Sequence, residues 1–208
     1  MLAEVIGLLA PPRCGACAAV CPPRAVLCGG CEADLRELRP RTVTAPGVDA
    51  AWAAAPYDGI ARELVVGLKF GRRLSLAGPI AEALAAALPP DLDGALVPVP
   101  ADPARRRRRG FDAAEEIARA LGARLGLEVR FCLRRTSGRR QVGRPRIERV
   151  AEPPRVRAVG EVPPRAVLVD DVRTTGATLG ACAAGLRAGG AHWVGALTFA
   201  AAEPGAGP

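Results

Sequence analysis

The stretch Ala166-Val-Leu-Val-Asp-Asp-Val-Arg-Thr-Thr-Gly-Ala-Thr178 decides the fold class. Its first four residues, 166–169, are apolar and predict a buried strand, which is followed directly by two aspartates. A tight loop then leads into an alanine-rich segment, which predicts a helix over residues 176–188. A buried strand joined to a helix by a short turn is the building unit of an α/β domain with a mainly parallel sheet.

The rest of residues 48–200 alternates in the same way. We expect further strands over residues 48–55, 95–99, 129–133 and 193–200, and helices over residues 59–70, 79–88 and 112–125. Residues 134–164 are polar, rich in arginine and proline, and too long for an ordinary connector. The organisation that we predict is a cysteine-rich module over residues 1–45, an α/β domain over residues 46–200 and a flexible tail over residues 201–208.

The aspartate pair and the loop after it predict a ligand. Ligands of parallel α/β sheets bind at the carboxyl ends of the strands. The loop offers backbone N–H groups, three hydroxyls and a helix N-terminus, which suit a phosphate. Asp170 and Asp171 can accept hydrogen bonds from the vicinal hydroxyls of a sugar, so the pair and the loop together predict a ribose 5-phosphate site. The alternative is that the two aspartates only cap the helix.

The positive charge of the chain is concentrated in one stretch. The net charge is +8, yet residues 101–157 alone carry 17 arginines against seven carboxylates. This stretch contains five consecutive arginines, from Arg105 to Arg109, and a second basic segment over residues 134–141. Arginine matches phosphate oxygens bidentately, so we expect these segments near a pyrophosphate, with Arg109 as the best candidate contact and the second segment as a catalytic lid. A solvated face or a nucleic-acid patch is the alternative for each run.

The segment from Ala166 to Thr178 resembles the phosphoribosyl pyrophosphate (PRPP) signature of type I phosphoribosyltransferases. The resemblance implies a five-stranded parallel sheet with helices on both faces, and it implies that Asp170 and Asp171 bind the ribose hydroxyls. It assigns the 5-phosphate to Thr174, Thr175, Gly176, Ala177 and Thr178, with Arg109 and Arg135 as further site residues. Mg²⁺ would enter together with PRPP.

Further motifs narrow the resemblance to the ComF family, whose members are phosphoribosyltransferase-like and linked to competence and DNA uptake. They are Tyr57-x-Gly59, Leu68-Lys69-Phe70, Val97-Pro98-Val99-Pro100, Arg109-Gly110-Phe111, Arg134-Arg135-Thr136 and Gln141. They cover nearly the whole chain in the order typical of that family. One departure is that Phe111 is followed by Asp112-Ala113, where the family usually has Asn-Gln.

The N-terminal cysteines form two C-x2-C pairs, Cys14/Cys17 and Cys28/Cys31, separated by ten residues. Four thiolates at this spacing predict a tetrahedral structural Zn²⁺, and the family resemblance implies the same zinc-binding module, described as a zinc ribbon. Cys21 is surplus, although it could replace a neighbour. A disulfide or redox pair is the alternative. Cys132 and Cys182 fall on predicted core elements, where they would act as small hydrophobic residues.

Other features limit the function classes. Aromatic residues make up 3% of the chain, which disfavours a platform for stacking bases. No apolar run reaches the roughly 18 residues of a membrane span, and the first residues lack a basic signal region, so we expect a cytoplasmic protein. The only histidine, His192, precedes the last predicted strand and has a surface or packing role in preference to a catalytic one.

Two functions remain open at this point. The first is an enzyme that transfers the phosphoribosyl group of PRPP, or of a related ribose 5-phosphate ligand, to an acceptor that the sequence does not identify. The second is a non-catalytic binding module with the same fold, which contacts single-stranded DNA or a helicase of DNA uptake through its basic stretch.

Overall fold

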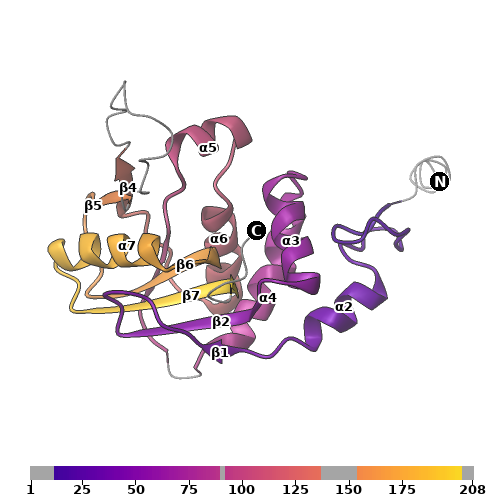
Figure 1. The fold of residues 1–208 in the computed structure, drawn as a ribbon, viewed down its shortest axis with the longest axis horizontal. Coiled ribbons are helices and arrows are strands. Elements are labelled where there is room, and N and C mark those ends of the chain that lie inside the picture. Colours follow the sequence, from indigo (N-terminus) through magenta and orange to yellow (C-terminus); the bar gives the residue numbers. More distant parts are fainter. Residues whose placement is uncertain (1–11, 90–91, 137–153, 203–208) are drawn as a thin grey trace, which may run out of the picture.

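A five-stranded sheet forms the centre of the protein in a computed structural model that describes residues 12–89, 92–136 and 154–202 (Figure 1). The strand order is β1-β2-β7-β6-β3. Its strands are β1 (Arg41–Thr42), β2 (Ala50–Pro56), β7 (Trp193–Ala201), β6 (Arg165–Arg173) and β3 (Ala95–Pro98). The last four are parallel, whereas β1 pairs antiparallel with β2 at the edge. The predicted mainly parallel α/β class is confirmed, but the expectation of five parallel strands is wrong at β1.

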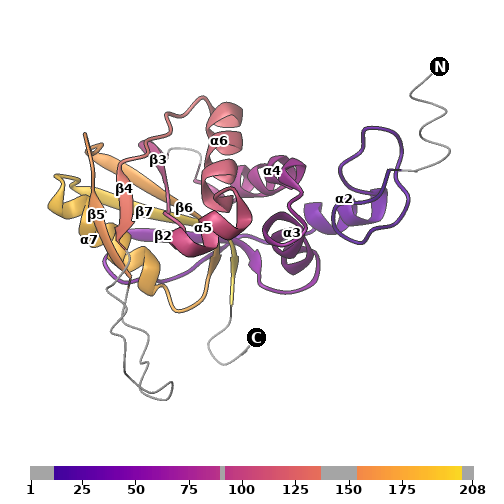
Figure 2. The same cartoon turned by 90° about the horizontal axis from the view of Figure 1, so that it is seen from above.

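Helices cover both faces of this sheet, as the alternation of side chains along β6 requires. Val167 and Val169 share one core with helices α3 (Gly59–Lys69), α4 (Ala77–Ala87) and α6 (Ala113–Leu125). Ala166 and Leu168 belong to a second core, which α7 (Ala177–Ala188) covers from the opposite face (Figure 2). The hairpin of β4 (Leu133–Thr136) and β5 (Arg155–Ala158) packs on α7.

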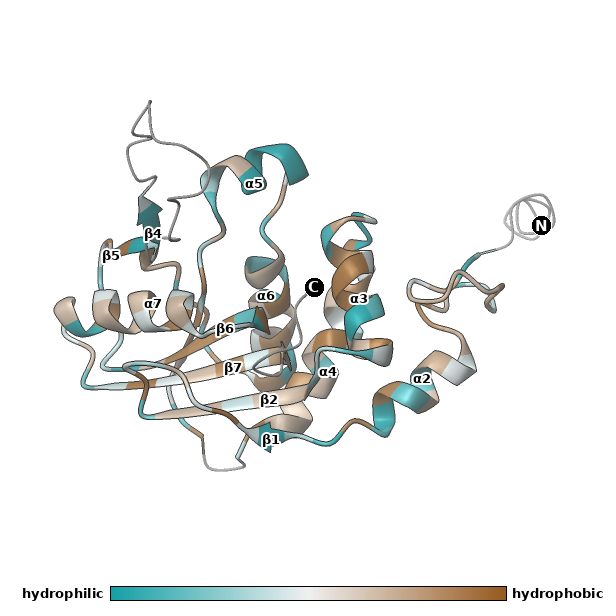
Figure 3. Ribbon diagram, in the orientation of Figure 1, coloured by the Kyte–Doolittle hydropathy of each residue, from teal (hydrophilic) through white to brown (hydrophobic). Residues whose placement is uncertain are grey.

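The five arginines form a helix that the sequence reading missed. Helix α5 (Pro103–Arg109) contains no buried residue and is the most hydrophilic helix end in Figure 3. The side chain of Asp102 accepts hydrogen bonds from the N–H groups of Ala104 and Arg105, at 2.9 and 3.2 Å, and Pro103 occupies the first turn. The helix ends at Gly110, whose φ of 86° closes the last turn. An N-cap, an N1 proline and a C-terminal glycine therefore define α5 without an apolar stripe.

Two predicted strands have different bounds in the structure. Strand β6 continues through Arg173, because Val172 and Arg173 still pair with Ala200 and Ala201 of β7. The two aspartates consequently lie inside the strand, four residues earlier than its end. The strand expected over residues 129–133 is reduced to a single bridge between Val129 and Leu96, after which the chain turns away and enters β4.

The cysteine-rich module precedes the sheet. Its helix α2 (Gly29–Arg36) starts at the second cysteine pair, so this half of the module is helical and not a β ribbon. Cys14, Leu27 and Cys31 are buried in the same core as α3. A short 3-10 turn, η1 (Leu74–Leu76), follows α3, and its Leu76 lies within that core. The module is therefore packed on the α/β domain at the side of α3.

Several smaller expectations are settled by burial. Cys132 and Cys182 are buried, as predicted, and His192 is exposed. Gln141, the remainder of the basic segment over residues 137–141 and the last six residues of the predicted tail lie outside the described residues. Within residues 12–89, 92–136 and 154–202, no helix has the length and apolar character that crossing a membrane requires.

Candidate functional site

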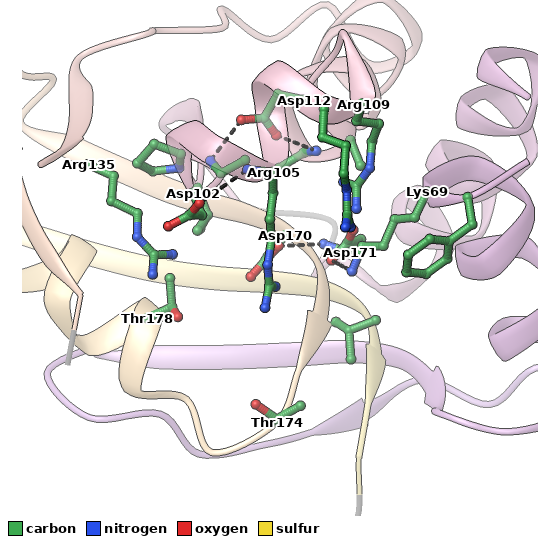
Figure 4. Close-up of a pocket in the computed structure, with 18 of the residues that line it drawn as sticks. Lys69, Asp102, Arg105, Arg109, Asp112, Arg135, Asp170, Asp171, Thr174 and Thr178 are labelled. Carbon is green, nitrogen blue, oxygen red and sulfur yellow. Dashed lines mark hydrogen bonds and ion pairs between the residues drawn. The ribbon is translucent and has the colours of Figure 1, made fainter. Parts of the chain in front are cut away.

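A cavity of about 490 Å³ opens at the carboxyl ends of β6 and β3 (Figure 4). Its floor is the end of β6 and the start of α7, its upper wall is the β3–α5 segment with α5, and α3 closes one side. Arg135 of β4 lies at the opposite side. The cavity therefore occupies the position where parallel α/β sheets bind ligands.

The two aspartates of β6 lie at the centre of this cavity. Asp171 is only 5% exposed, and its Oδ1 forms an ion pair with Nζ of Lys69 at 2.7 Å. Its N–H group donates a hydrogen bond to Oδ1 of Asp170 at 2.8 Å. Burial, followed by the charge of Asp171, raises the pKa of the Asp170 carboxyl well above its ordinary value. Two adjacent carboxylates with one ammonium partner leave acceptor oxygens for the hydroxyls of a ligand.

The threonine loop joins β6 to α7 at the edge of the cavity. Thr174 and Thr178 line the cavity, whereas Thr175, Gly176 and Ala177 form the turn between them. Gly176 has a φ of 78°, and a Cβ there would lie 3.2 Å from Pro46 Cδ, so the turn requires glycine. Oγ1 of Thr175 accepts a hydrogen bond from the N–H of Ala177 at 3.3 Å. The turn thus presents the N-terminus of α7 beside two threonine hydroxyls.

The arginines of α5 divide between different surroundings. Arg105, Arg108 and Arg109 line the cavity, and Arg135 joins them from β4. Arg106 instead pairs with Glu115 of α6 at 2.9 Å. The structure therefore brings the two arginines chosen from the sequence, Arg109 and Arg135, to the same cavity as the aspartates, and adds two more cations to its wall.

Arg109 has a defined environment among these arginines. Its guanidinium lies 5.7 Å from the ring centre of Phe70 and 5.8 Å from that of Phe111. Its carbonyl oxygen accepts a hydrogen bond from Arg72 at 2.8 Å. Two rings and a fixed backbone hold this guanidinium in place, which is what recognition of a planar anion requires.

Two site residues were not chosen from the sequence. Lys69 occurred only within a family motif, yet it is the sole lysine among 28 arginines, a signal that could have found it. Asp112 is 3% exposed and accepts hydrogen bonds from the N–H groups of Ala101 and Ala114, at 2.8 and 3.1 Å. Burial raises its pKa. Asp112 therefore ties the loop after β3 to the start of α6, in addition to its expected role as a helix cap.

A second cavity of about 590 Å³ lies behind the β3–α5 segment. Arg135, Pro100 and Ala101 line both cavities, and Arg134 lines only the second one. The exposed ring of Phe131 also lines it, with the guanidinium of Arg119 4.4 Å from the ring centre. The two basic segments of the sequence therefore serve two neighbouring hollows and not one.

The four predicted metal ligands form one cluster. The sulfur atoms of Cys14, Cys17, Cys28 and Cys31 all lie within 4.8 Å of one another, and Cys21 is buried outside the cluster. Four thiolates bound tetrahedrally to Zn²⁺ are about 3.8 Å apart, given Zn–S bonds of about 2.3 Å, so the arrangement fits this ion. Burial raises the pKa of Cys14, but hydrogen bonds from the N–H groups of Cys28, Cys17 and Ala16 lower it overall to about 6. The donor set is compatible with a structural zinc site.

The metal module contacts the α3 side of the cavity directly. The guanidinium of Arg73 donates hydrogen bonds to the carbonyl oxygens of Gly15 and Cys14, at 2.6 and 3.4 Å. Gly67 of α3 approaches the same loop so closely that a Cβ would lie 2.8 Å from the oxygen of Gly15. The cysteine loop therefore packs against the helix whose last residue, Lys69, reaches Asp171.

Comparisons with known proteins add no homologue to this description: neither the scan against protein-family models nor the search of curated proteins gave a match. The fold class, the cavity and the cysteine cluster consequently rest on the structure alone.

Proposed function

We propose that the chain binds PRPP and transfers its phosphoribosyl group to an acceptor. The observation that carries the proposal is the sharing of one cavity by the Asp170–Asp171 pair, the threonine turn before α7 and four arginines. A sugar diol, a monophosphate and a pyrophosphate need these three kinds of partner in this proximity. Membership of the ComF family, which the sequence motifs suggest, is part of the same proposal.

The ribose 5-phosphate part is assigned to β6 and the turn after it. Lys69 engages Oδ1 of Asp171, so we assign Oδ2 of Asp171 and the oxygens of Asp170 to the 2- and 3-hydroxyls. The 5-phosphate then lies at the N-terminus of α7, where Thr174, Thr178 and the N–H groups between them donate hydrogen bonds.

The pyrophosphate is assigned to the arginine wall. Arg105 and Arg108 reach the cavity from α5, and Arg135 reaches it from the hairpin. When the bond between C1 of the ribose and the pyrophosphate oxygen lengthens, negative charge grows on the leaving group while the sugar becomes cationic. Guanidinium groups stabilise the first charge and the aspartates the second, so positioning and electrostatics carry the rate. Mg²⁺ belongs to this scheme as part of the substrate, where it neutralises pyrophosphate oxygens.

Calorimetric titration with PRPP and Mg²⁺ tests the proposal. We expect the double variant Asp170→Asn, Asp171→Asn to bind PRPP at least about tenfold more weakly than wild type, since each lost bond involves a charged acceptor. A matched control is the variant Asp34→Asn, Glu63→Gln, which removes the same charge from exposed positions away from the cavity. Equal weakening in both variants, or unchanged binding in the first, would contradict the proposal.

A specific observation also supports the second candidate function, a module that binds single-stranded DNA or a helicase of DNA uptake. Arg105 to Arg108 are exposed on α5, and Arg134 and Arg119 extend the positive surface around the second cavity. Contacts to a phosphate backbone weaken steeply as salt rises. Affinity for an oligonucleotide that is the same in low and high salt would exclude this candidate.

A further inference from the structure

The α3 end of the main cavity differs in character from the rest. Phe70, the C-cap residue of α3, lines the cavity with 66% of its surface exposed, and Tyr57 lines it nearby. Arg109 lies over the ring of Phe70 and contacts Phe111 behind it. The chain has only four phenylalanines, two tryptophans and one tyrosine, so three rings at one mouth are a concentration that average composition does not produce.

The charges at this end are positive. Lys69 and Arg109 flank the rings, and every carboxylate that lines the cavity within the described residues already has a partner. Asp102 and Asp112 accept backbone N–H groups, Asp170 accepts the N–H of Asp171, and Asp171 pairs with Lys69. No described carboxylate or histidine at this end is therefore free to remove a proton from an incoming nucleophile.

The position of this end relative to the sugar gives it a role. Thr178 and the N-terminus of α7 lie on one side of Asp170, and Lys69 lies on the other (Figure 4). A ribose held by its 5-phosphate at the turn and by its hydroxyls at Asp170 and Asp171 points its C1 away from the turn. The aromatic mouth is then the side from which an acceptor approaches C1.

We propose that this mouth binds the acceptor, and that the acceptor is a planar aromatic ring that carries a negative charge, such as a ring carboxylate, and whose nucleophilic nitrogen bears no proton. This inference rests on the function proposed above. Phe70 stacks on the ring, while Arg109 and Lys69 attract the anion. A neutral amine, which must lose a proton during transfer, does not fit a mouth without a base.

The reaction balances without a general base. The lone pair of the ring nitrogen forms a bond to C1, the bond between C1 and the pyrophosphate oxygen breaks, and pyrophosphate leaves with that electron pair. Because the nitrogen carries no hydrogen, no proton has to be transferred. The cations at the two ends divide the work: those of α5 and β4 hold the leaving group, and those at the mouth hold the acceptor.

Three small probes separate shape from charge. Benzoate is planar and anionic, benzamide is planar and neutral, and cyclohexanecarboxylate is anionic but not planar. Each is titrated by ligand-observed NMR into the zinc-loaded full chain that has been saturated with ribose 5-phosphate. We expect benzoate to bind several-fold more tightly than either of the other two, and we expect Phe70→Ala to weaken benzoate about threefold to tenfold.

Variants make the test specific to this mouth. Phe70→Tyr keeps a ring and restores benzoate binding, and Arg109→Lys keeps the charge but loses the planar group, so it weakens benzoate while sparing ribose 5-phosphate. Phe131→Ala is the matched control, because Phe131 is also exposed and also lies against an arginine, but in the second cavity. Phe70 is largely exposed, so its alanine variant keeps the fold, which a thermal melt checks.

The outcomes distinguish this inference from the proposed function. Ribose 5-phosphate binding together with benzoate binding that Phe70→Ala leaves unchanged overturns the acceptor site alone. Benzoate binding that depends on Phe70, without any ribose 5-phosphate binding, overturns the proposed function and the acceptor role together and leaves only a site for aromatic anions. Equal binding of benzoate and cyclohexanecarboxylate overturns the requirement for a planar ring.

Discussion

The ammonium of Lys69 lies 2.7 Å from Oδ1 of Asp171, and this ion pair joins the end of α3 to the centre of strand β6. The side chain of Asp171 is 7% exposed and that of Lys69 23%, so the pair is largely removed from water. A single contact thus connects the helix that packs on the cysteine module with the carboxylates that we assign to the ribose.

Removing this lysine should cost stability in a pH-dependent way. Lys69→Met leaves a buried carboxylate without its cation, and we expect the free energy of unfolding at pH 7 to fall by about 2 kcal/mol. Lys69 also lowers the pKa of Asp170, so its loss raises that pKa further. Protonation of Asp170 relieves the repulsion between the carboxylates, and the deficit relative to wild type should therefore shrink as the pH falls. Urea unfolding at several pH values measures this, and a deficit that grows toward acid contradicts it.

Asp170 should be costly for folding although it serves the site. Its raised pKa means that the folded state binds a proton more readily than the unfolded chain does. The stability of the wild type therefore falls as the pH rises from the unfolded pKa through the folded pKa, and the loss is complete above the folded value. Asp170→Asn avoids this loss, so at pH 7 the variant should unfold at a higher temperature than wild type while binding PRPP more weakly. A lower melting temperature at pH 7 would show that the carboxylate stabilises the fold.

Asp112 should tolerate asparagine but not alanine. Its two oxygens accept N–H groups from Ala101 and Ala114, so Asp112→Ala leaves two donors unpaired and should cost about 1–3 kcal/mol. An asparagine keeps an acceptor oxygen and avoids burying a charge, which the raised pKa of Asp112 shows to be unfavourable. Chemical unfolding of both variants tests this difference, and an equal loss in both would assign the role of Asp112 to its charge.

The cysteine cluster should hold one Zn²⁺ per chain, and its loss should affect the α3 side of the cavity. Zinc content measured by mass spectrometry should fall in Cys17→Ser and stay unchanged in Cys21→Ala, because only Cys17 belongs to the cluster. Since Arg73 ties the cysteine loop to α3, chelation should also lower the melting temperature. Loss of zinc from the Cys21 variant alone would reverse the assignment.

The sequence predicts the class of the fold because β6 and α7 carry strong periodic patterns and a glycine turn. It also predicts which cysteines cluster, since the two C-x2-C pairs fix the geometry locally. The extent of β6 was underestimated because polar residues at its end pair with β7, a partner that a local pattern does not reveal. Helix α5 was missed because five arginines have no apolar period, and only its caps identify it.

The site was predicted in part for the same reason. Asp170, Asp171, Thr174, Thr178, Arg109 and Arg135 line one cavity as expected. Lys69 and Phe70 belong to it through the packing of α3 beside β7 and the cysteine loop, a tertiary contact that no short motif encodes. The aromatic mouth therefore became visible only in the structure.

The backbone amide spectrum of ¹⁵N-labelled protein, recorded during a titration with PRPP and Mg²⁺, tests the central claim most directly. If the 5-phosphate lies at the N-terminus of α7, the amide signals of the turn from Thr174 to Thr178 will shift in a saturable manner, together with those of Asp170 and Asp171. The signal of Asp34, which is exposed and away from the cavity, will stay in place. Signals of the turn that do not move at saturating PRPP, or shifts confined to the second cavity around Phe131, would contradict the account.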